Sequence, residues 1–296
     1  MTETGQEDLA RRFERNRRRL RALAFRMLGA SGEADEAVQE AWLRLARSEP
    51  REIEDLSSWL TTVVARICLD MLRARRARRE EPLGPHVPDP IVSPVEGGDP
   101  EHEALVAESV GLAMLGVLET LGPEERVAFV LHDMFSVPFD QVADLLDRSP
   151  AATRKAASRA RKRVEAEPTE PDADLGRQRE VVDAFFEASR AGDFDALVAV
   201  LHPDVVLRSD GGEARPSANH VIRGAAEVAS RAMTFAGLSP FVQPVLVNGV
   251  AGVLVSPRGK PFSVLAFTVA GGRVVAIDAL ADPARLERLE LGTEAR

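Results

Sequence analysis

Six side chains suited to nucleic-acid binding recur at helical spacing near the middle of the chain. They are Arg154, Lys155, Ser158, Arg159, Arg161 and Lys162. At about 100° per residue they share one side of a helix, and small or apolar residues from Thr153 to Val164 fill the other. Guanidinium and ammonium groups bind phosphates and guanine edges in the major groove. The spacing therefore predicts a helix that lies against DNA on one face and against a scaffold on the other.

The residues before this helix predict a partner helix and a tight turn. Four apolar residues share one face of that partner helix: Phe139, Val142, Ala143 and Leu146. Asp147 follows in the turn, and Ser149 and Pro150 are a favourable N-cap and first helical residue. Together the two helices form a predicted helix-turn-helix. The alternative is a solvated basic helix that ends a domain.

Charge is distributed in blocks along the 296 residues, whose net charge is −9. Residues 11–26 contain eight arginines and residues 73–79 contain five, whereas residues 80–125 contain eleven acids and no Lys or Arg. Local basic patches in an acidic chain favour a defined DNA footprint over indiscriminate coating of nucleic acid.

The composition also excludes several classes of protein. Cys68 is the single cysteine, which excludes an internal disulfide and a Cys-rich zinc site. The polar N-terminus has no apolar core typical of a signal peptide, and no 18-residue apolar run occurs. We expect a cytoplasmic protein that has no membrane partner, metal or cofactor.

The first 80 residues predict an all-helical module. A helix that starts near Glu33 places Val38, Ala41, Trp42 and Leu45 on its inner face. Another runs from about residue 57 into the basic residues 73–79.

Three blocks in order carry a family resemblance over about the first 165 residues: GEADEAVQEAWLRLAR, DLSSWLTTVVARICLDMLRARRARRE and LGPEERVAFVLHDMFSVPFDQVADLLDRSPAATRKAASRARKRV. They resemble regions 2 and 4 of an extracytoplasmic-function (ECF) sigma factor. The resemblance implies two all-α modules that bind core RNA polymerase and promoter DNA. The helix at 154–162 would then contact the −35 element.

The resemblance also implies roles within region 2. Polymerase-binding residues would be Asp35, Gln39, Glu40, Leu43 and Arg44. Residues at the −10 element would be Trp59, Arg66, Arg73, Arg75 and Arg76. The module would hold a base flipped out of the melted strand, which costs a few kcal/mol of stacking. For Trp59 the alternative is a core position, with the loop 50–58 touching the base instead.

A Pro- and Gly-rich segment, residues 81–105, predicts an acidic linker without regular structure. Its GPHVPDP sequence resembles a linker motif of the ECF subgroup that carries a C-terminal SnoaL-like domain, and His86 stands where that subgroup has tryptophan. The resemblance implies that this motif faces two segments of the C-terminal domain and that the contact regulates the protein. The residues implied are Gly84, Pro85, Pro88, Asp89, Pro90, Asp210, Gly211, Gly212, Asp282, Pro283 and Arg285.

The C-terminal region predicts two amphipathic helices followed by apolar strand-like runs, an α+β order. It resembles the SnoaL-like, cystatin-like cone with a curved antiparallel sheet. We therefore expect sigma region 2 at 8–80, the linker at 81–105, sigma region 4 at 106–166, a second linker at 167–177 and the cone at 178–290.

A cone can hold a pocket, which would suit either an enzyme or the binding of a small-molecule ligand. The acid–base candidates are His202, Asp204, Asp210, His220 and Asp278. The chain contains no Tyr, which removes the phenolic oxyanion donor usual in steroid isomerases. We predict no catalytic residue and a sensing or protein-binding cone.

Three functional hypotheses follow. The leading one is a promoter-specificity subunit regulated in cis by its cone. The second is a cone enzyme or ligand sensor with a vestigial DNA-binding module. The third is a one-component regulator that binds operators without polymerase, which would leave the helix at Gln39–Arg44 without a purpose.

Overall fold

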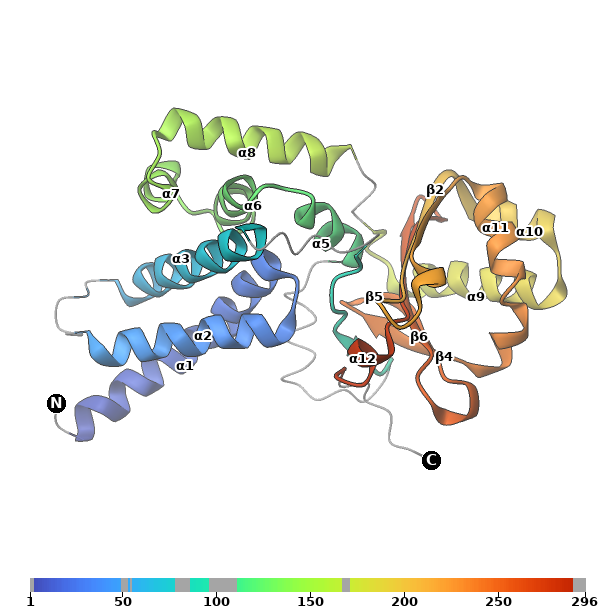
Figure 1. Ribbon diagram of the computed structural model, residues 1–296, viewed down its shortest axis with the longest axis horizontal. Coiled ribbons are helices and arrows are strands. Elements are labelled where there is room, and N and C mark those ends of the chain that lie inside the picture. Colours follow the sequence, from blue (N-terminus) through green and yellow to red (C-terminus); the bar gives the residue numbers. More distant parts are fainter. Residues whose placement is uncertain are drawn as a thin grey trace. The chain divides into compact units, whose positions relative to one another are not determined.

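The computed structural model describes residues 3–48, 53, 55–77, 86–95, 111–166 and 171–289 (Figure 1). Contacts divide the chain into two compact units. The helical unit combines Met1–Glu81 with Val117–Val164, and the cone unit combines Pro82–Gly116 with Glu165–Arg296. The described linker residues, 86–95, therefore belong with the cone.

Three helices form the first half of the helical unit. They are α1 (Glu3–Leu28), α2 (Ser31–Arg47) and α3 (Leu56–Ala77), and each contacts the other two. The α2 helix buries Val38, Ala41 and Leu45, as its periodicity predicts. Trp42 was expected on the same inner face but is half-buried, with its ring centroid 5.0 Å from that of Phe13. An indole is too large to be enclosed at the edge of this small bundle.

The second half of the helical unit contains the predicted helix-turn-helix. This half consists of α5 (Leu112–Glu119), α6 (Pro123–Phe129), the π-helix η2 (Val130–Met134), α7 (Phe139–Leu146) and α8 (Pro150–Glu165). The predicted helix-turn-helix is the pair α7 and α8. Asp147 ends α7 in the left-handed conformation, with φ 52°. The α8 helix buries the five inner-face residues predicted, Thr153, Ala156, Ala157, Ala160 and Val164.

Phe139 differs from the prediction because it is half-buried and not part of the core. Its ring stacks on His132 with centroids 3.6 Å apart, and the Arg154 guanidinium lies 5.6 Å above it. The fourth buried residue of α7 is Leu145 and not Phe139.

The cone unit is a seven-stranded sheet with helices packed on one face (Figure 1). The helices are α9 (Leu175–Ala191), α10 (Phe194–Val200) and α11 (Ala225–Met233), with a short α12 (Pro283–Leu286). The strands are β1 (Val92–Ser93), β2 (Leu201–Asp210), β3 (His220–Arg223), β4 (Val242–Val247), β5 (Val250–Val255), β6 (Ser263–Ala270) and β7 (Arg273–Leu280). Their order is β1-β4-β5-β6-β7-β2-β3.

The sheet departs from the wholly antiparallel one expected, because β2 and β7 pair in parallel, from Val206 opposite Ala276 to Asp210 opposite Leu280. A parallel pair needs a long crossover, which here contains β3, α11 and β4 to β6. The four-residue strand β3 was also missed. Asp204, expected at a helix–strand turn, lies within β2.

The linker holds a second departure. It was expected to lack regular structure, but β1 pairs with β4 at the edge of the sheet, with Val92 opposite Val247 and Ser93 opposite Leu246. Among the described helices, none is long and apolar enough to cross a membrane.

Candidate functional site

The outer face of α8 presents the predicted −35 residues to solvent. Five of them are exposed, Arg154, Lys155, Ser158, Arg159 and Lys162, and Arg161 is half-buried. The buried alanines of the opposite face hold the helix close to its scaffold. The helix therefore has the shape expected of a recognition helix.

Acidic side chains of the same module form ion pairs with some arginines of α8. Arg159 pairs with Glu125 at 2.6 Å, Arg161 pairs with Asp133, and Arg163 lies 3.4 Å from Glu125. These bonds are at the surface, where such a pair contributes about 0–1 kcal/mol. Lys155 and Lys162 have no ion pair with a described residue. The first turns of α8 are thus the least committed to contacts within the protein.

The residues predicted at the −10 element differ in their surroundings. Arg66 is exposed, and Trp59 is half-buried. Arg75 binds Glu33 and the Leu28 carbonyl, and Arg73 binds Glu124 of α6 at 3.1 Å. Both arginines therefore have acidic partners within the helical unit. Arg76 is exposed, and most of the loop 50–58 lies outside the described residues.

The predicted polymerase-binding face of α2 is exposed at Asp35, Gln39, Leu43 and Arg44. Leu43 is 39% exposed, which is high for a leucine in a folded protein. Three of the predicted residues form ion pairs within the helical unit. Asp35 binds Arg21 at 2.5 Å, and Glu40 binds Arg44 at 3.0 Å one turn along the helix.

A buried arginine that the sequence did not reveal joins the two modules of the helical unit. Arg126 on α6 is 2% exposed, and its guanidinium donates to the Arg26 carbonyl at 3.2 and 3.3 Å. Burial lowers the pKa of Arg126 to about 10, although the charge of Glu119 opposes this shift. The signal was present in the P-E-x-R sequence after Gly122, but only the fold shows that the arginine points inward.

In the cone unit, an arginine clamp joins the linker to two segments of the C-terminal domain. Arg285 of α12 donates to Asp89 and Asp210, at 2.7 Å each, and to the Val87 carbonyl at 2.5 Å. The Val87 N–H donates to Asp210 at 3.1 Å, and the His86 ring nitrogen lies 3.2 Å from the same carboxylate. We call these five residues the linker dock.

Electrostatics favour the closed dock. Burial alone would raise the pKa of Asp210, but the hydrogen bonds from His86 and Val87 and the charge of Arg285 outweigh it and lower that pKa to about 2. The carboxylate is therefore ionised at neutral pH and binds the guanidinium with a charge-assisted hydrogen bond.

Glycines allow the two segments of the domain to approach each other. Gly212 has φ +61°, and a Cβ placed on it would lie 2.3 Å from the Asp282 carboxylate. Asp282 caps α12 by accepting from the Ala284 N–H at 2.9 Å, and Pro283 follows at the first helical position. The loop at 210–212 and the segment at 282–285 thus lie together, and both Asp210 and Arg285 face the linker.

Backbone pairing extends the contact beyond the dock. Ile91 donates to the Asn248 side chain at 2.7 Å and accepts from the Asn248 N–H at 2.8 Å, beside the β1–β4 pair. Pro88 and Pro90 are buried. Gly84 and Pro85, predicted for the same contact, lie outside the described residues.

The acid–base candidates do not form one site. Asp278 pairs with Arg208 at 3.0 Å, and burial raises the pKa of that carboxyl. Asp210 belongs to the dock, Asp204 is exposed, and only His220 of the five lines the cavity of the cone. Neither Asp nor Glu is among the described residues that line this cavity. The described residues contain no group of three or more His, Cys, Asp or Glu side chains that could bind a metal ion.

Comparisons with known proteins agree with this arrangement. Residues 12–78 match Sigma-70 region 2, and residues 112–164 match Sigma-70, region 4. The ECF RNA polymerase sigma factor SigJ of Mycobacterium tuberculosis is 39% identical over 92% of this chain and 91% of its own length. A probable ECF RNA polymerase sigma factor of the same species, SigI, is 36% identical over 91% of this chain and 92% of its own.

The whole-chain fold is shared as well. The crystal structure of M. tuberculosis SigJ superposes with a TM-score of 0.78 at 36% identity, covering 95% of this chain and 99% of that one. The match extends through the helical modules, the linker and the α+β cone. The chain belongs to the ECF family of RNA polymerase sigma factors, and its two helical modules are followed by a C-terminal α+β domain.

Proposed function

We propose that this sigma factor directs core RNA polymerase to specific promoters and that its cone regulates initiation by holding the linker between the two DNA-binding modules. The observation that carries the regulatory step is the linker dock. Arg285 is 10% exposed and binds two carboxylates and a carbonyl, two of these three acceptors belonging to the linker. A contact of this kind has a geometry too specific for incidental packing.

Promoter reading is assigned to the start of α8. Residues at the N-terminal end of a recognition helix contact base edges. Arg154, Lys155 and Ser158 lie there and form no ion pair with a described residue. Arg159 and Arg161 already bind acids of their own module, so we assign them to phosphate contacts that compete with these pairs.

Polymerase binding is assigned to the exposed face of α2. Gln39 and Leu43 supply a hydrogen-bonding group and an apolar surface with no described contact, and the Glu40–Arg44 pair lies beside them. Protein interfaces concentrate binding energy in a few such side chains.

Regulation follows from the position of the docked residues in the chain. The dock fixes residues 86–93, which lie between region 2 and region 4. Each released residue could add up to about 3.3–3.6 Å of reach. Closing the dock therefore limits how far apart the two modules can lie on a promoter, and opening it removes that limit.

Run-off transcription with core polymerase tests the assignment of the two surfaces. The promoter is first identified by mapping transcripts after overexpression. Arg154→Ala should change the base preference, whereas Glu40→Lys combined with Leu43→Ala should weaken core binding in a pull-down and leave DNA preference unaltered. Unchanged base preference and normal core association in these variants would contradict the assignment.

The cone-enzyme hypothesis is not favoured by these contacts. An isomerase-type proton transfer needs a carboxylate or another base that faces the substrate. The lining offers only His220 for that role. A turnover screen on ketosteroids and epoxides would detect such an activity directly.

A further inference from the structure

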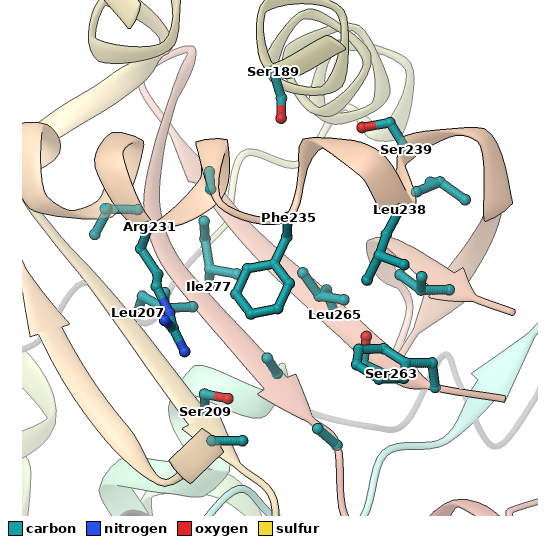
Figure 2. Close-up of a pocket in the computed structure, with 18 of the residues that line it drawn as sticks. Ser189, Leu207, Ser209, Arg231, Phe235, Leu238, Ser239, Ser263, Leu265 and Ile277 are labelled. Carbon is teal, nitrogen blue, oxygen red and sulfur yellow. The ribbon is translucent and has the colours of Figure 1, made fainter. Parts of the chain in front are cut away.

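The cone encloses a cavity of about 280 Å³ between its helices and its sheet (Figure 2). This volume is at the lower end of the roughly 300–1,000 Å³ typical of small-molecule sites. Most of the wall is apolar, with side chains from α9, β2, the 3-10 helix η4 (Ala236–Phe241), β6 and β7: Phe185, Phe186, Leu207, Leu238, Leu265 and Ile277. A molecule with a substantial apolar body would fit this wall.

One cation in the lining has no hydrogen-bond acceptor among the described residues. Arg231 comes from α11, and its side chain extends toward Leu207 and Ser209 on β2 (Figure 2). Its Nε is buried without a hydrogen bond, and no ion pair joins its guanidinium to a described residue. The guanidinium stacks on Phe235 at 4.9 Å, which orients it without neutralising its charge. A buried donor without an acceptor costs about 1–3 kcal/mol, and more when the group is charged.

Four serines add unpaired hydroxyl groups to the same wall. Ser189, Ser209, Ser239 and Ser263 are buried and line the cavity. Their hydroxyls form no hydrogen bond with a described residue. All four are drawn in Figure 2. These hydroxyls are therefore available to hydrogen-bond with a molecule in the cavity.

The remaining charges of the lining are also positive or neutral. Arg215 donates to the Phe262 and Ala281 carbonyls at 2.9 Å each and stacks on Phe262, contacts that leave its charge uncompensated. Burial, together with the charge of Arg231, lowers the pKa of His220. With no carboxylate among the described lining residues, the cavity has a positive potential and apolar walls.

We propose that the cone binds a small apolar carboxylic acid in its ionised form, with the carboxylate on Arg231 and Ser209 and the hydrocarbon body against the phenylalanines and β6. A carboxylate matches the planar fork of a guanidinium and can accept two parallel hydrogen bonds. A carboxylate carries one charge, which Arg231 can compensate, and its hydrocarbon body can use the apolar wall that a phosphate ion would leave unfilled.

The test compares three probes of one shape on the full-length protein: 4-phenylbutanoate, 4-phenylbutanamide and 4-phenylbutylamine. Isothermal titration calorimetry measures each affinity without polymerase or DNA. The result therefore does not depend on whether the proposed function in transcription is correct. The carboxylate should bind at least about tenfold more tightly than the amide, equal to about 1.4 kcal/mol, and the amine should not bind. This comparison within the unaltered protein does not depend on how any variant folds.

Variants then assign the anion to Arg231. Arg231→Gln should remove the preference for the carboxylate over the amide, and Ser209→Ala should weaken carboxylate binding several-fold. Arg190→Gln, an exposed arginine of α9 outside the cavity, is the matched control and should keep the preference. Equal binding of carboxylate and amide, a preference that survives Arg231→Gln, or no binding of 4-phenylbutanoate at millimolar concentration would each overturn the proposal.

Discussion

Arg285 and Arg231 lie in the same unit and have opposite surroundings. Arg285 is 10% exposed and binds Asp89, Asp210 and the Val87 carbonyl. Arg231 also has a buried guanidinium atom but binds no described acceptor. A compensated buried cation joins two segments of chain, whereas an uncompensated one reduces stability unless a ligand supplies the missing charge. The same residue type therefore indicates a structural clamp in one region and a binding site in the other.

The largest effect is expected when the clamp loses its cation. Arg285→Gln leaves the buried Asp210 without its charged partner, and breaking such a pair costs about 3–5 kcal/mol. Because the Val87 N–H donates to Asp210, hydrogen exchange at Val87 reports dock opening directly. Exchange should accelerate by at least about a hundredfold, since each 1.4 kcal/mol is a factor of ten.

The matched control is Arg288→Gln, an exposed arginine one turn further along the chain. Exchange at Val87 should be unchanged in this variant. Similar exchange in Arg285→Gln and the unaltered protein would mean that the guanidinium does not hold the linker.

Asp210→Asn tests the acid side of the clamp through pH. The pKa of Asp210 is lowered from 3.8 to about 2 in the folded protein, so its contribution is fully present above the unfolded pKa and is lost as pH falls through the folded one. That shift corresponds to about 2 kcal/mol. The stability difference between the two proteins, from urea denaturation, should stay constant from about pH 8 to 5 and shrink below about pH 4. A difference that shrinks already near neutral pH would be inconsistent with this ionised carboxylate.

The comparison of paired and unpaired arginines extends to α8. Arg154 forms no ion pair with a described residue, whereas Arg159 binds Glu125 at 2.6 Å. Arg154→Ala should cost at least about 1 kcal/mol of promoter affinity and relax preference at one base. Arg159→Ala should weaken binding to all sequences alike. Promoter titrations at fixed salt measure both, and a base-specific loss in Arg159→Ala alone would reverse the assignment.

The smallest effect on stability is expected at Arg231. Arg231 is half-buried and forms no ion pair with a described residue, so Arg231→Gln should change the free energy of unfolding by no more than about 0.5 kcal/mol. Thermal and urea unfolding without added ligand measure this. A loss comparable to that of Arg285→Gln would show that Arg231 has a structural partner.

Local periodicity predicted the recognition helix well. The alternation of alanines and cations over 16 residues specifies both faces of α8, and the five buried residues are those expected. Long-range pairing could not be predicted in this way. Which acid binds Arg159, and that Arg126 points into the interior, depend on elements brought together by the fold.

The two arginines of the cone unit show the same limit. The contact between the linker motif and Arg285 was expected from the family resemblance alone. Local patterns cannot predict it, because Asp89 and Arg285 are 196 residues apart in the sequence. Arg231 gave no signal, because an arginine on an amphipathic helix predicts a solvated face. The cavity beneath it exists only once β2, β6 and β7 lie side by side. The parallel β2–β7 pair was missed for the related reason that strand patterns do not specify pairing partners.

Run-off transcription with a variant whose linker dock is open tests the central claim most directly. Full-length protein, Arg285→Gln and Arg288→Gln are compared in run-off transcription with core polymerase on the mapped promoter, after Val87 exchange has verified which dock is open. The account predicts that Arg285→Gln differs from full-length protein in initiation, while Arg288→Gln matches it. Equal initiation from all three proteins, with the Arg285→Gln dock demonstrably open, would contradict regulation through the linker.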